Sequence, residues 1–211
     1  MENDIKLAVF DFDSTLMDGE TIDFLAKDYG VEQEVKAITQ KAMNGELDFF
    51  ESLTYRLGLL KGMKLSRVNE ICQNLPFIKG AKETIQEFKN RGYRVVCFSG
   101  GYKNATVPAK DYLGLDGEFS NILHTKNGIL TGMFGGEMCF SESKGEMLKT
   151  LQSVLKIGVE KTITIGDGAN DLSMFKYASE RVAFCAKEIL KKEATIIIEE
   201  KDLTKIFNYL D

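Results

Sequence analysis

Residues 7–15 read LAVFDFDST, an apolar run that ends in two aspartates, Asp11 and Asp13. A short, nearly continuous apolar run is typical of a strand that is covered on both faces. Side chains two positions apart on a strand point the same way, so we expect Asp11 and Asp13 to address one point. Two neighbouring carboxylates repel each other, which is costly unless a cation lies between them or the site uses a raised pKa. The alternative is a pair of solvated aspartates at a strand end.

The rest of the chain alternates between short apolar runs and helical patterns. The apolar runs, which indicate strands, lie at 95–98, 163–165, 182–184 and 196–198. The helical patterns lie at 79–91, 102–113, 143–156, 170–178, 186–192 and 202–210. This alternation predicts an α/β fold with a parallel, doubly wound, Rossmann-like sheet. Ligands in such sheets bind beyond the carboxyl ends of the strands, which is where Asp11 and Asp13 lie.

One long interval breaks the alternation. Residues 15–74 contain no strand pattern and at least three amphipathic helices. An insertion directly after the first strand would lie over the carboxyl end of that strand. We therefore expect a small helical cap domain at 15–74, inserted into a catalytic α/β core made of 1–14 and 75–211.

A second irregular interval covers residues 119–134. The pair Asn127-Gly128 lies between two strand-like arms there, at 119–125 and 129–134. This pattern predicts a hairpin. We expect it to form a small antiparallel element beside the main sheet.

Composition excludes several classes of protein. The 211 residues carry 27 Lys and Arg against 32 Asp and Glu, a formal charge of −5. This charge argues against broad binding to nucleic acid or to an anionic membrane, although a local cation can still attract a small anionic substrate. No segment approaches the about 18 apolar residues of a membrane span, and the first residues lack the basic start of a signal peptide. We expect a cytoplasmic protein; the sequence does not decide its oligomeric state.

The cysteines and the histidine give no sign of chemistry. Cys72, Cys97, Cys139 and Cys185 form no Cys-x-x-Cys pair, and none has an Arg six positions on. We expect them to be free thiols in a reducing compartment. The single histidine, His124, lies in an arm of the predicted hairpin and is expected to be a solvated strand residue.

A second acidic cluster follows the run 162–165. Residues 166–171 read GDGAND, in which glycines flank Asp167 and allow backbone to come close to a ligand. Asn170 and Asp171 begin the next helical pattern, where capping accounts for one of them but not for Asp167. Two acidic clusters at strand ends of one parallel sheet make a site of hard oxygen ligands, which suits Mg²⁺.

Two further positions are candidates for phosphate binding. Ser99-Gly100-Gly101 follows a strand and precedes a helix, where a hydroxyl and free backbone N–H groups bind phosphate; a simple turn is the alternative. Ser143 and Glu146 resemble a capping box, which places Lys144 in the first helical turn. A cation there opposes the helix dipole, so Lys144 either meets an anion or is an ordinary surface lysine.

Two charged residues stand out in the expected cap. Arg56 lies on an apolar helical stripe that includes Phe49 and Leu53, so it either extends to solvent or meets a carboxylate or phosphate. Glu20 lies where the chain leaves the first strand for the insertion. Its alternative role is that of a glutamate favoured by the dipole of a helix N-terminus.

Taken together, these motifs resemble the haloacid dehalogenase superfamily of phosphatases over essentially the whole chain. Within that superfamily the chain is most similar to the branch that hydrolyses phosphoserine, although Tyr102 stands where the branch often has Phe. The resemblance implies an Mg²⁺-dependent hydrolase that forms an aspartyl-phosphate, in the last step of serine synthesis. The small-molecule substrate would be phosphoserine.

The resemblance also implies roles for individual residues. Asp11 would be the nucleophile and Asp13 the general acid and base. Mg²⁺ would be held by Asp11, the backbone carbonyl of Asp13, and Asp167, with Asp171 ordering its surroundings. The substrate would be bound by Glu20, Met43, Phe49, Arg56, Ser99, Gly100, Lys144 and Asn170.

Other functions remain open at this stage. A phosphotransferase that moves phosphate from phosphoserine to an alcohol such as homoserine would use the same residues. A phosphatase for another small metabolite is a second alternative, and a catalytically silent binding module is a third. A dinucleotide-binding enzyme is disfavoured because Asp171 stands where the fingerprint needs a third glycine.

Overall fold

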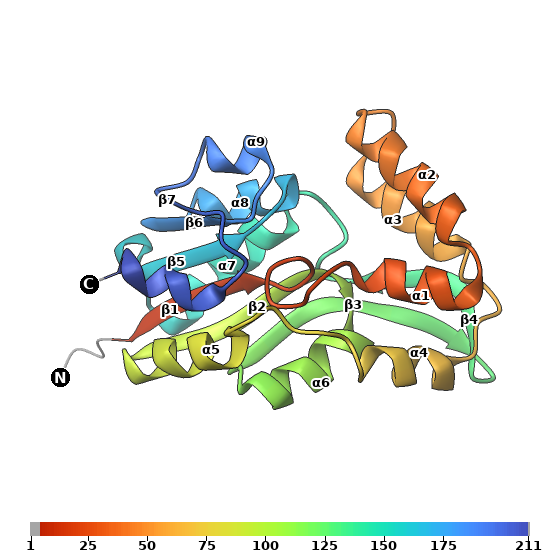
Figure 1. Cartoon of the computed structure of the whole chain (residues 1–211), viewed down its shortest axis with the longest axis horizontal. Coiled ribbons are helices and arrows are strands. Elements are labelled where there is room, and N and C mark those ends of the chain that lie inside the picture. The colour runs from red at the N-terminus through yellow and green to blue at the C-terminus, as the bar shows by residue number, and fades with distance from the viewer. Residues whose placement is uncertain (1–4, 211) are drawn as a thin grey trace.

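The computed structural model describes residues 5–210, which contain a seven-stranded sheet with helices on both faces (Figure 1). The strand order is β4-β3-β2-β1-β5-β6-β7. All neighbouring strands are parallel except β3 and β4. The strands are β1 (Lys6–Asp11), β2 (Tyr93–Tyr102), β3 (Gly117–Lys126), β4 (Ile129–Gly136), β5 (Thr162–Gly166), β6 (Glu180–Phe184) and β7 (Ile196–Ile198). The predicted α/β fold with a doubly wound sheet is confirmed.

The central strand β1 is apolar on both faces because both faces are covered. Ala8 and Phe10 belong to one buried cluster, and Leu7 and Val9 belong to the other. Helices α5 (Ala81–Asn90) and α6 (Lys103–Leu113) contribute to the first cluster, and α7 (Ser143–Leu155) and α8 (Leu172–Phe175) to the second. The alternation of side chains along one strand therefore joins the two layers of helices to the sheet.

The carboxyl-terminal part of the chain has shorter helices than the sequence patterns indicate. The segment predicted as helix at 170–178 divides into a 3₁₀ turn, η2 (Ala169–Asp171), and α8. The last predicted helix is a 3₁₀ helix, η3 (Leu203–Asn208). The remaining short elements are η1 (Val159–Lys161) and α9 (Glu188–Lys191).

The predicted hairpin is present, but its expected place was wrong. Strands β3 and β4 are antiparallel to each other, as the Asn127-Gly128 turn indicates. However, β3 also pairs in parallel with β2, so the hairpin extends the main sheet instead of lying beside it. The sequence of a hairpin fixes its own turn but not the strand on which it docks.

The interval after β1 is helical, as predicted, and lies at the carboxyl ends of the strands (Figure 1). Its helices are α1 (Thr21–Tyr29), α2 (Glu32–Met43), α3 (Phe49–Gly58) and α4 (Leu65–Cys72). Leu25 of α1 and Val68 of α4 are buried in the same cluster as Phe10, and this cluster also includes Val35 of α2 and Leu57 of α3. The turn that joins α2 to α3 projects away from the sheet (Figure 1). The division into a core and a cap domain stays a prediction. No helix in the described part of the chain is long and apolar enough to cross a membrane.

Candidate active site

Strand pairing brings three of the candidate segments together. Asp11, the last residue of β1, pairs with Phe98 of β2, and Phe10 pairs with Ile165 of β5. Ser99 therefore lies on one side of Asp11, and the segment that begins at Gly166 lies on the other. Segments from three parts of the sequence meet because the carboxyl ends of neighbouring parallel strands share one edge of the sheet.

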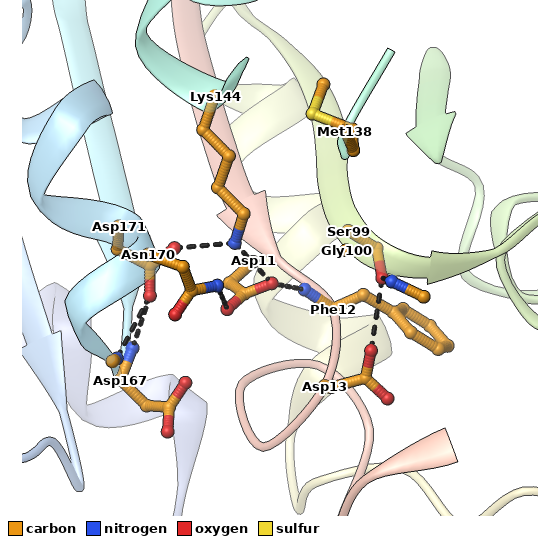
Figure 2. A network of polar contacts seen from close by, with 12 residues as sticks. Asp11, Phe12, Asp13, Ser99, Gly100, Met138, Lys144, Asp167, Asn170 and Asp171 are labelled. Atoms are coloured by element: carbon orange, nitrogen blue, oxygen red, sulfur yellow. Dashed lines mark hydrogen bonds and ion pairs between the residues drawn. The ribbon is translucent and has the colours of Figure 1, made fainter. Parts of the chain in front are cut away.

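A buried lysine joins two of the carboxylates (Figure 2). The Nζ atom of Lys144 lies 2.7 Å from Oδ1 of Asp11 and 2.6 Å from Oδ1 of Asp171. Lys144 and Asp11 are each only 3% exposed. Burial alone would lower the pKa of Lys144, but the two carboxylates raise it above its usual range, so the lysine is a fixed cation.

Lys144 occupies the first turn of α7, as predicted, but the capping box was wrong. The residue before the helix is Glu142, and its side chain makes no capping hydrogen bond. The hydroxyl of Ser143 accepts a hydrogen bond from the backbone N–H of Phe140 instead. The carboxylates that pair with Lys144 belong to two other strand ends: Asp11 ends β1, and Asp171 follows β5.

The acidic cluster carries more negative charge than Lys144 neutralises. Asp11, Asp167 and Asp171 each place one oxygen within 4.8 Å of the others. Burial, followed by the charge of Asp171, raises the pKa of Asp11 well above its ordinary value. The same two causes raise the pKa of Asp167 to about 7. Such a cluster favours a bound cation, because a cation would stabilise the ionised carboxylates.

The hydrogen bonds show which carboxylates are available to a metal. Both oxygens of Asp171 are occupied, one by Lys144 and the other by the backbone N–H groups of Asp167 and Gly168, each at 3.0 Å. Among residues 5–210, the Asp167 carboxylate has no hydrogen bond or ion pair (Figure 2). From the same described residues, Oδ2 of Asp11 accepts only from the amide of Asn170, at 3.5 Å. Asp11 and Asp167 can therefore bind a cation directly, while Asp171 holds the neighbouring groups in place.

Asp13 lies apart from this cluster. Its Oδ1 accepts hydrogen bonds from the backbone N–H and the hydroxyl of Thr21, both at 2.6 Å, and its Oδ2 accepts one from the Ser99 hydroxyl at 3.1 Å (Figure 2). Strand β1 ends at Asp11, so the alternation of side chains does not extend to Asp13. The two aspartates thus have different partners, and Thr21 ties Asp13 to the start of α1.

The Ser99-Gly100-Gly101 segment is held by a residue that the sequence did not reveal. The Asn121 side chain is fully buried and donates to the carbonyl oxygens of Gly100 and Met138, both at 3.1 Å. On the other side of the Gly100–Gly101 peptide, the Gly101 N–H donates to Ser99 Oγ at 2.8 Å. Asn121 therefore fixes the segment expected to bind phosphate, and its only sequence signal is a polar residue inside a predicted strand.

The helical interval contributes two of its predicted residues to this region. A Cβ atom added to Gly100 would lie 2.9 Å from the Phe49 ring, so this ring of α3 lies directly on the segment that follows Ser99. Glu20 accepts a hydrogen bond from the Ser14 hydroxyl at 2.8 Å. Burial, and then the charge of Asp13, raises the pKa of Glu20 to about 8. A carboxyl group with this pKa is mostly protonated at pH 7, and a cationic group bound beside it would favour its ionised form.

The remaining two predicted residues of the helical interval, Arg56 and Met43, have fewer contacts that locate them relative to the site. Arg56 is half-buried, donates from Nε to the carbonyl oxygen of Ser52 at 3.2 Å, and lowers the pKa of Glu20, so its guanidinium shares the region of that carboxylate. Met43, at the end of α2, is 63% exposed. Its place in the substrate site stays a prediction.

The cysteines and the histidine match their predictions. All four cysteines are free, and only Cys185 is exposed. His124 is exposed on β3, where its Nδ1 lies 2.9 Å from the Thr131 hydroxyl. None of them takes part in the acidic cluster.

Known proteins resemble this chain over its whole length. The family model of the haloacid dehalogenase-like hydrolases matches residues 5–179. The phosphoserine phosphatase of Wolinella succinogenes is 64% identical over 98% of this chain and 100% of its own length. That of Methanocaldococcus jannaschii is 48% identical over 100% of both chains.

Solved structures of phosphoserine phosphatases also resemble this chain over nearly its whole length. A structure of a phospho-aspartyl intermediate analogue of phosphoserine phosphatase superposes with a TM-score of 0.93 at 48% identity, covering 98% of this chain and 99% of the other. A substrate-bound phosphoserine phosphatase complex superposes with a TM-score of 0.92 at 48% identity, covering 98% of each chain.

Proposed function

Because the chain belongs to the haloacid dehalogenase-like hydrolases, we propose that it is a phosphoserine phosphatase, which hydrolyses O-phosphoserine to serine and phosphate. One observation carries the proposal: the buried Asp11 is paired with a buried lysine and lies close to Asp167, whose carboxylate has no hydrogen bond or ion pair to residues 5–210. This arrangement suits a carboxylate that reacts with an anionic phosphoryl group. The reaction would complete serine synthesis.

Asp11 is the nucleophile of the proposed reaction. Its Oδ1 is held by Lys144 and by the backbone N–H of Phe12 at 2.6 Å, so Oδ2 is the freer oxygen. Attack on phosphorus forms the Asp11–phosphate bond and breaks the bond between phosphorus and the serine oxygen. Water then attacks the aspartyl-phosphate, which releases phosphate and restores the carboxylate.

Asp13 moves the protons of both steps. Protonated Asp13 gives its proton to the serine oxygen as that oxygen leaves, and the resulting carboxylate accepts a proton from the attacking water. Its hydrogen bonds to Ser99 and Thr21 hold the carboxyl group in one orientation. This is a different role from that of Asp11, which accords with the different partners of the two side chains.

The phosphoryl oxygens are bound by groups around Asp11. Lys144, the Ser99 hydroxyl, the Gly100 N–H and the Asn170 amide are the proposed donors. Burial and the charge of Asp171 raise the pKa of Asp11, and the positive charge of Lys144 opposes that rise and so favours the ionised nucleophile. The negative charge of the transferring group is thus met by donors that are already in place.

A divalent cation completes the charge balance. We propose Mg²⁺, held by Asp11, Asp167 and the backbone carbonyl of Asp13, because hard oxygen ligands suit this ion. Bound there, it would supply positive charge to the phosphoryl group and reduce its repulsion from Asp11. Asp171 would order this site through its bonds to Lys144 and to the N–H groups of Asp167 and Gly168.

The pKa of Asp167 gives cation binding a pH dependence. The cation-free protein holds this pKa at about 7, so the carboxyl group is mostly protonated at about pH 6 and mostly ionised at about pH 8. A cation at pH 6 must therefore displace a proton. We expect MgCl₂ to raise Tm more at pH 8 than at pH 6, measured by calorimetry. In Asp167→Asn the difference should become smaller, because only the part due to the raised pKa of Asp11 remains; equal shifts in the unaltered chain would refute direct binding by Asp167.

The amino-acid part of the substrate is recognised from the helical interval. Glu20, whose pKa is raised by burial and then by the charge of Asp13, would bind the ammonium group, and Arg56 would bind the carboxylate. Phe49 would cover the phosphate-binding segment as an apolar wall that excludes water. A contribution of the exposed Met43 to that wall stays a prediction.

Arg56→Ala should change substrate preference more than general activity. Removing one partner of a desolvated charge pair costs roughly 2–5 kcal/mol, so kcat/KM for phosphoserine should fall about 30-fold or more. Turnover of a small aryl phosphate, which has no carboxylate, should fall far less. The control is Arg94→Ala, which removes an exposed arginine near Asp116. Equal losses on both substrates would refute a role in binding the carboxylate.

The proposed function is tested by phosphate release from a panel of phosphorylated amino acids and sugars, with Mg²⁺ and with a chelator. Phosphoserine should be the best substrate, and the chelator should abolish its turnover. A sugar phosphate that is hydrolysed faster would overturn the substrate assignment. Adding homoserine tests the phosphotransferase: a fall in free phosphate with formation of phosphohomoserine would show transfer to the alcohol.

A further inference from the structure

Three aromatic side chains join the end of the α2–α3 hairpin to the sheet. Phe50 of α3 stacks on Phe140, with ring centroids 5.3 Å apart and an interplanar angle of 23°. Phe50 also lies 5.8 Å from the ring of Phe134 on β4. We call Phe50, Phe134 and Phe140 the aromatic cluster. None of the roles proposed above uses it.

The aromatic cluster connects two segments that both carry proposed active-site residues. Phe50 directly follows Phe49, whose ring lies on Gly100. Phe140 begins the turn before α7: its N–H donates to Ser143 Oγ at 3.1 Å, and its carbonyl accepts from the Ser143 N–H at 3.1 Å. Lys144 directly follows Ser143. The contact of Phe50 with Phe140 therefore fixes α3 relative to the turn that carries the lysine.

The α2–α3 hairpin is attached more firmly at one end than at the other. Near α4, the Gly62 N–H donates to the Leu130 carbonyl and the Leu130 N–H to the Met63 carbonyl, both at 2.9 Å, which pairs this part of the interval with β4. On α2, by contrast, only Val35 is buried. The opposite end is held to the sheet through Phe49 and the aromatic cluster.

The first turn of α3, which carries both aromatic rings, is held by a reciprocal pair of hydrogen bonds. Asp48 caps the helix by accepting from the Glu51 N–H at 2.8 Å, and the Glu51 side chain accepts from the Asp48 N–H at 2.9 Å. Neighbouring residues on a helix point about 100° apart. A movement of this turn away from the sheet therefore separates Phe49 from Gly100 and Phe50 from Phe140 at the same time.

Substrate must nevertheless reach Asp11, which is 3% exposed, as is Lys144, while Ser99 is fully buried. We propose that Phe50 and Phe140 are positioning residues that latch the α2–α3 hairpin over the nucleophile, and that breaking their contact is part of substrate binding and product release. This inference rests on the proposed function, because it assigns the position in which Phe50 contacts Phe140 to the substrate-bound state. The rings suit such a role: Phe50 is 41% and Phe140 61% exposed, so separating them disturbs little of the core.

The kinetic test uses Phe50→Ala, Phe140→Ala and the double variant, with saturating Mg²⁺. An aromatic pair contributes enough to shift an equilibrium about 3- to 10-fold, so KM for phosphoserine should rise about 3- to 10-fold while kcat does not fall. The double variant should lose no more than Phe50→Ala, because the single changes remove the same contact. Tyr55→Ala is the matched control: Tyr55 is a 52% exposed aromatic residue of α3 without a ring partner among residues 5–210.

A fluorescence measurement tests the latch without turnover. The chain contains no Trp, so Phe140→Trp introduces a single reporter into the stack. In an Asp11→Asn background, adding phosphoserine should change its emission, and Phe50→Ala should remove most of that change. An emission change that persists in Phe50→Ala, unchanged KM in both single variants, or additive effects in the double variant would each overturn the latch. Absence of phosphate release from the unaltered chain would instead overturn the proposed function.

Discussion

Asp11→Asn should lower kcat for phosphoserine by about 10⁴-fold or more, because it removes the nucleophile on which the proposed reaction depends. The amide oxygen can still accept from the Phe12 N–H, and Lys144 keeps Asp171 as a counter-ion at 2.6 Å. The variant should therefore fold normally and still bind phosphoserine. Phosphate release under saturating substrate and Mg²⁺ measures the loss.

The matched control for this variant is Asp111→Asn, which alters an exposed aspartate on α6 by the same chemistry. It should leave kcat within about twofold of the unaltered chain. Thermal unfolding of both variants shows whether the fold is retained. A folded Asp11→Asn protein with kcat reduced less than tenfold would contradict the assignment of the nucleophile.

Asp13→Asn should lower kcat for phosphoserine by about 10²- to 10⁴-fold, the usual contribution of general acid–base catalysis. An aryl phosphate gives a sharper result, because its leaving group needs no proton. With that substrate, aspartyl-phosphate should form quickly and be hydrolysed slowly. The expected observation is a burst of aryl alcohol equal to the enzyme concentration, followed by slow turnover.

The control for Asp13→Asn separates proton transfer from support of α1. Thr21→Val keeps the backbone N–H that donates to Asp13 Oδ1 and removes only the hydroxyl donor. It should change kcat by less than about tenfold and show no burst. If Asp13→Asn slowed both substrates equally and gave no burst, Asp13 would not be the group that activates water.

The sheet was predictable because its strands have a simple physical signature. Leu7–Phe10 is apolar on both faces since helices cover both sides of β1. The segment at 163–165 is also fully buried, with Thr164 between two apolar residues. Because β1 pairs in parallel with β2 and β5, the strand ends that carry Asp11, Ser99 and Asp167 lie side by side. The docking of the β3–β4 hairpin was missed because its turn residues carry no information about the neighbouring strand.

The parts of the site that the sequence did not reveal depend on contacts between distant segments. Asn121 holds Gly100 and Met138 through a buried side chain, yet it lies in an ordinary strand pattern. Ser143 resembles a helix cap, but its hydroxyl accepts a hydrogen bond from the Phe140 N–H, which precedes the helix. Phe50 and Phe140 meet only when α3 folds onto the sheet, and no local pattern records such a contact.

The central claim is that the Asp11 carboxylate becomes covalently phosphorylated by phosphoserine. The direct measurement is to mix the enzyme and Mg²⁺ with phosphoserine labelled on phosphorus, quench in acid within a turnover, and map the labelled peptide. We predict label on the β1 peptide at Asp11, lost on treatment with hydroxylamine and absent in Asp11→Asn. Release of phosphate with no labelled protein, or with label on another residue such as Ser99 or His124, would contradict the account.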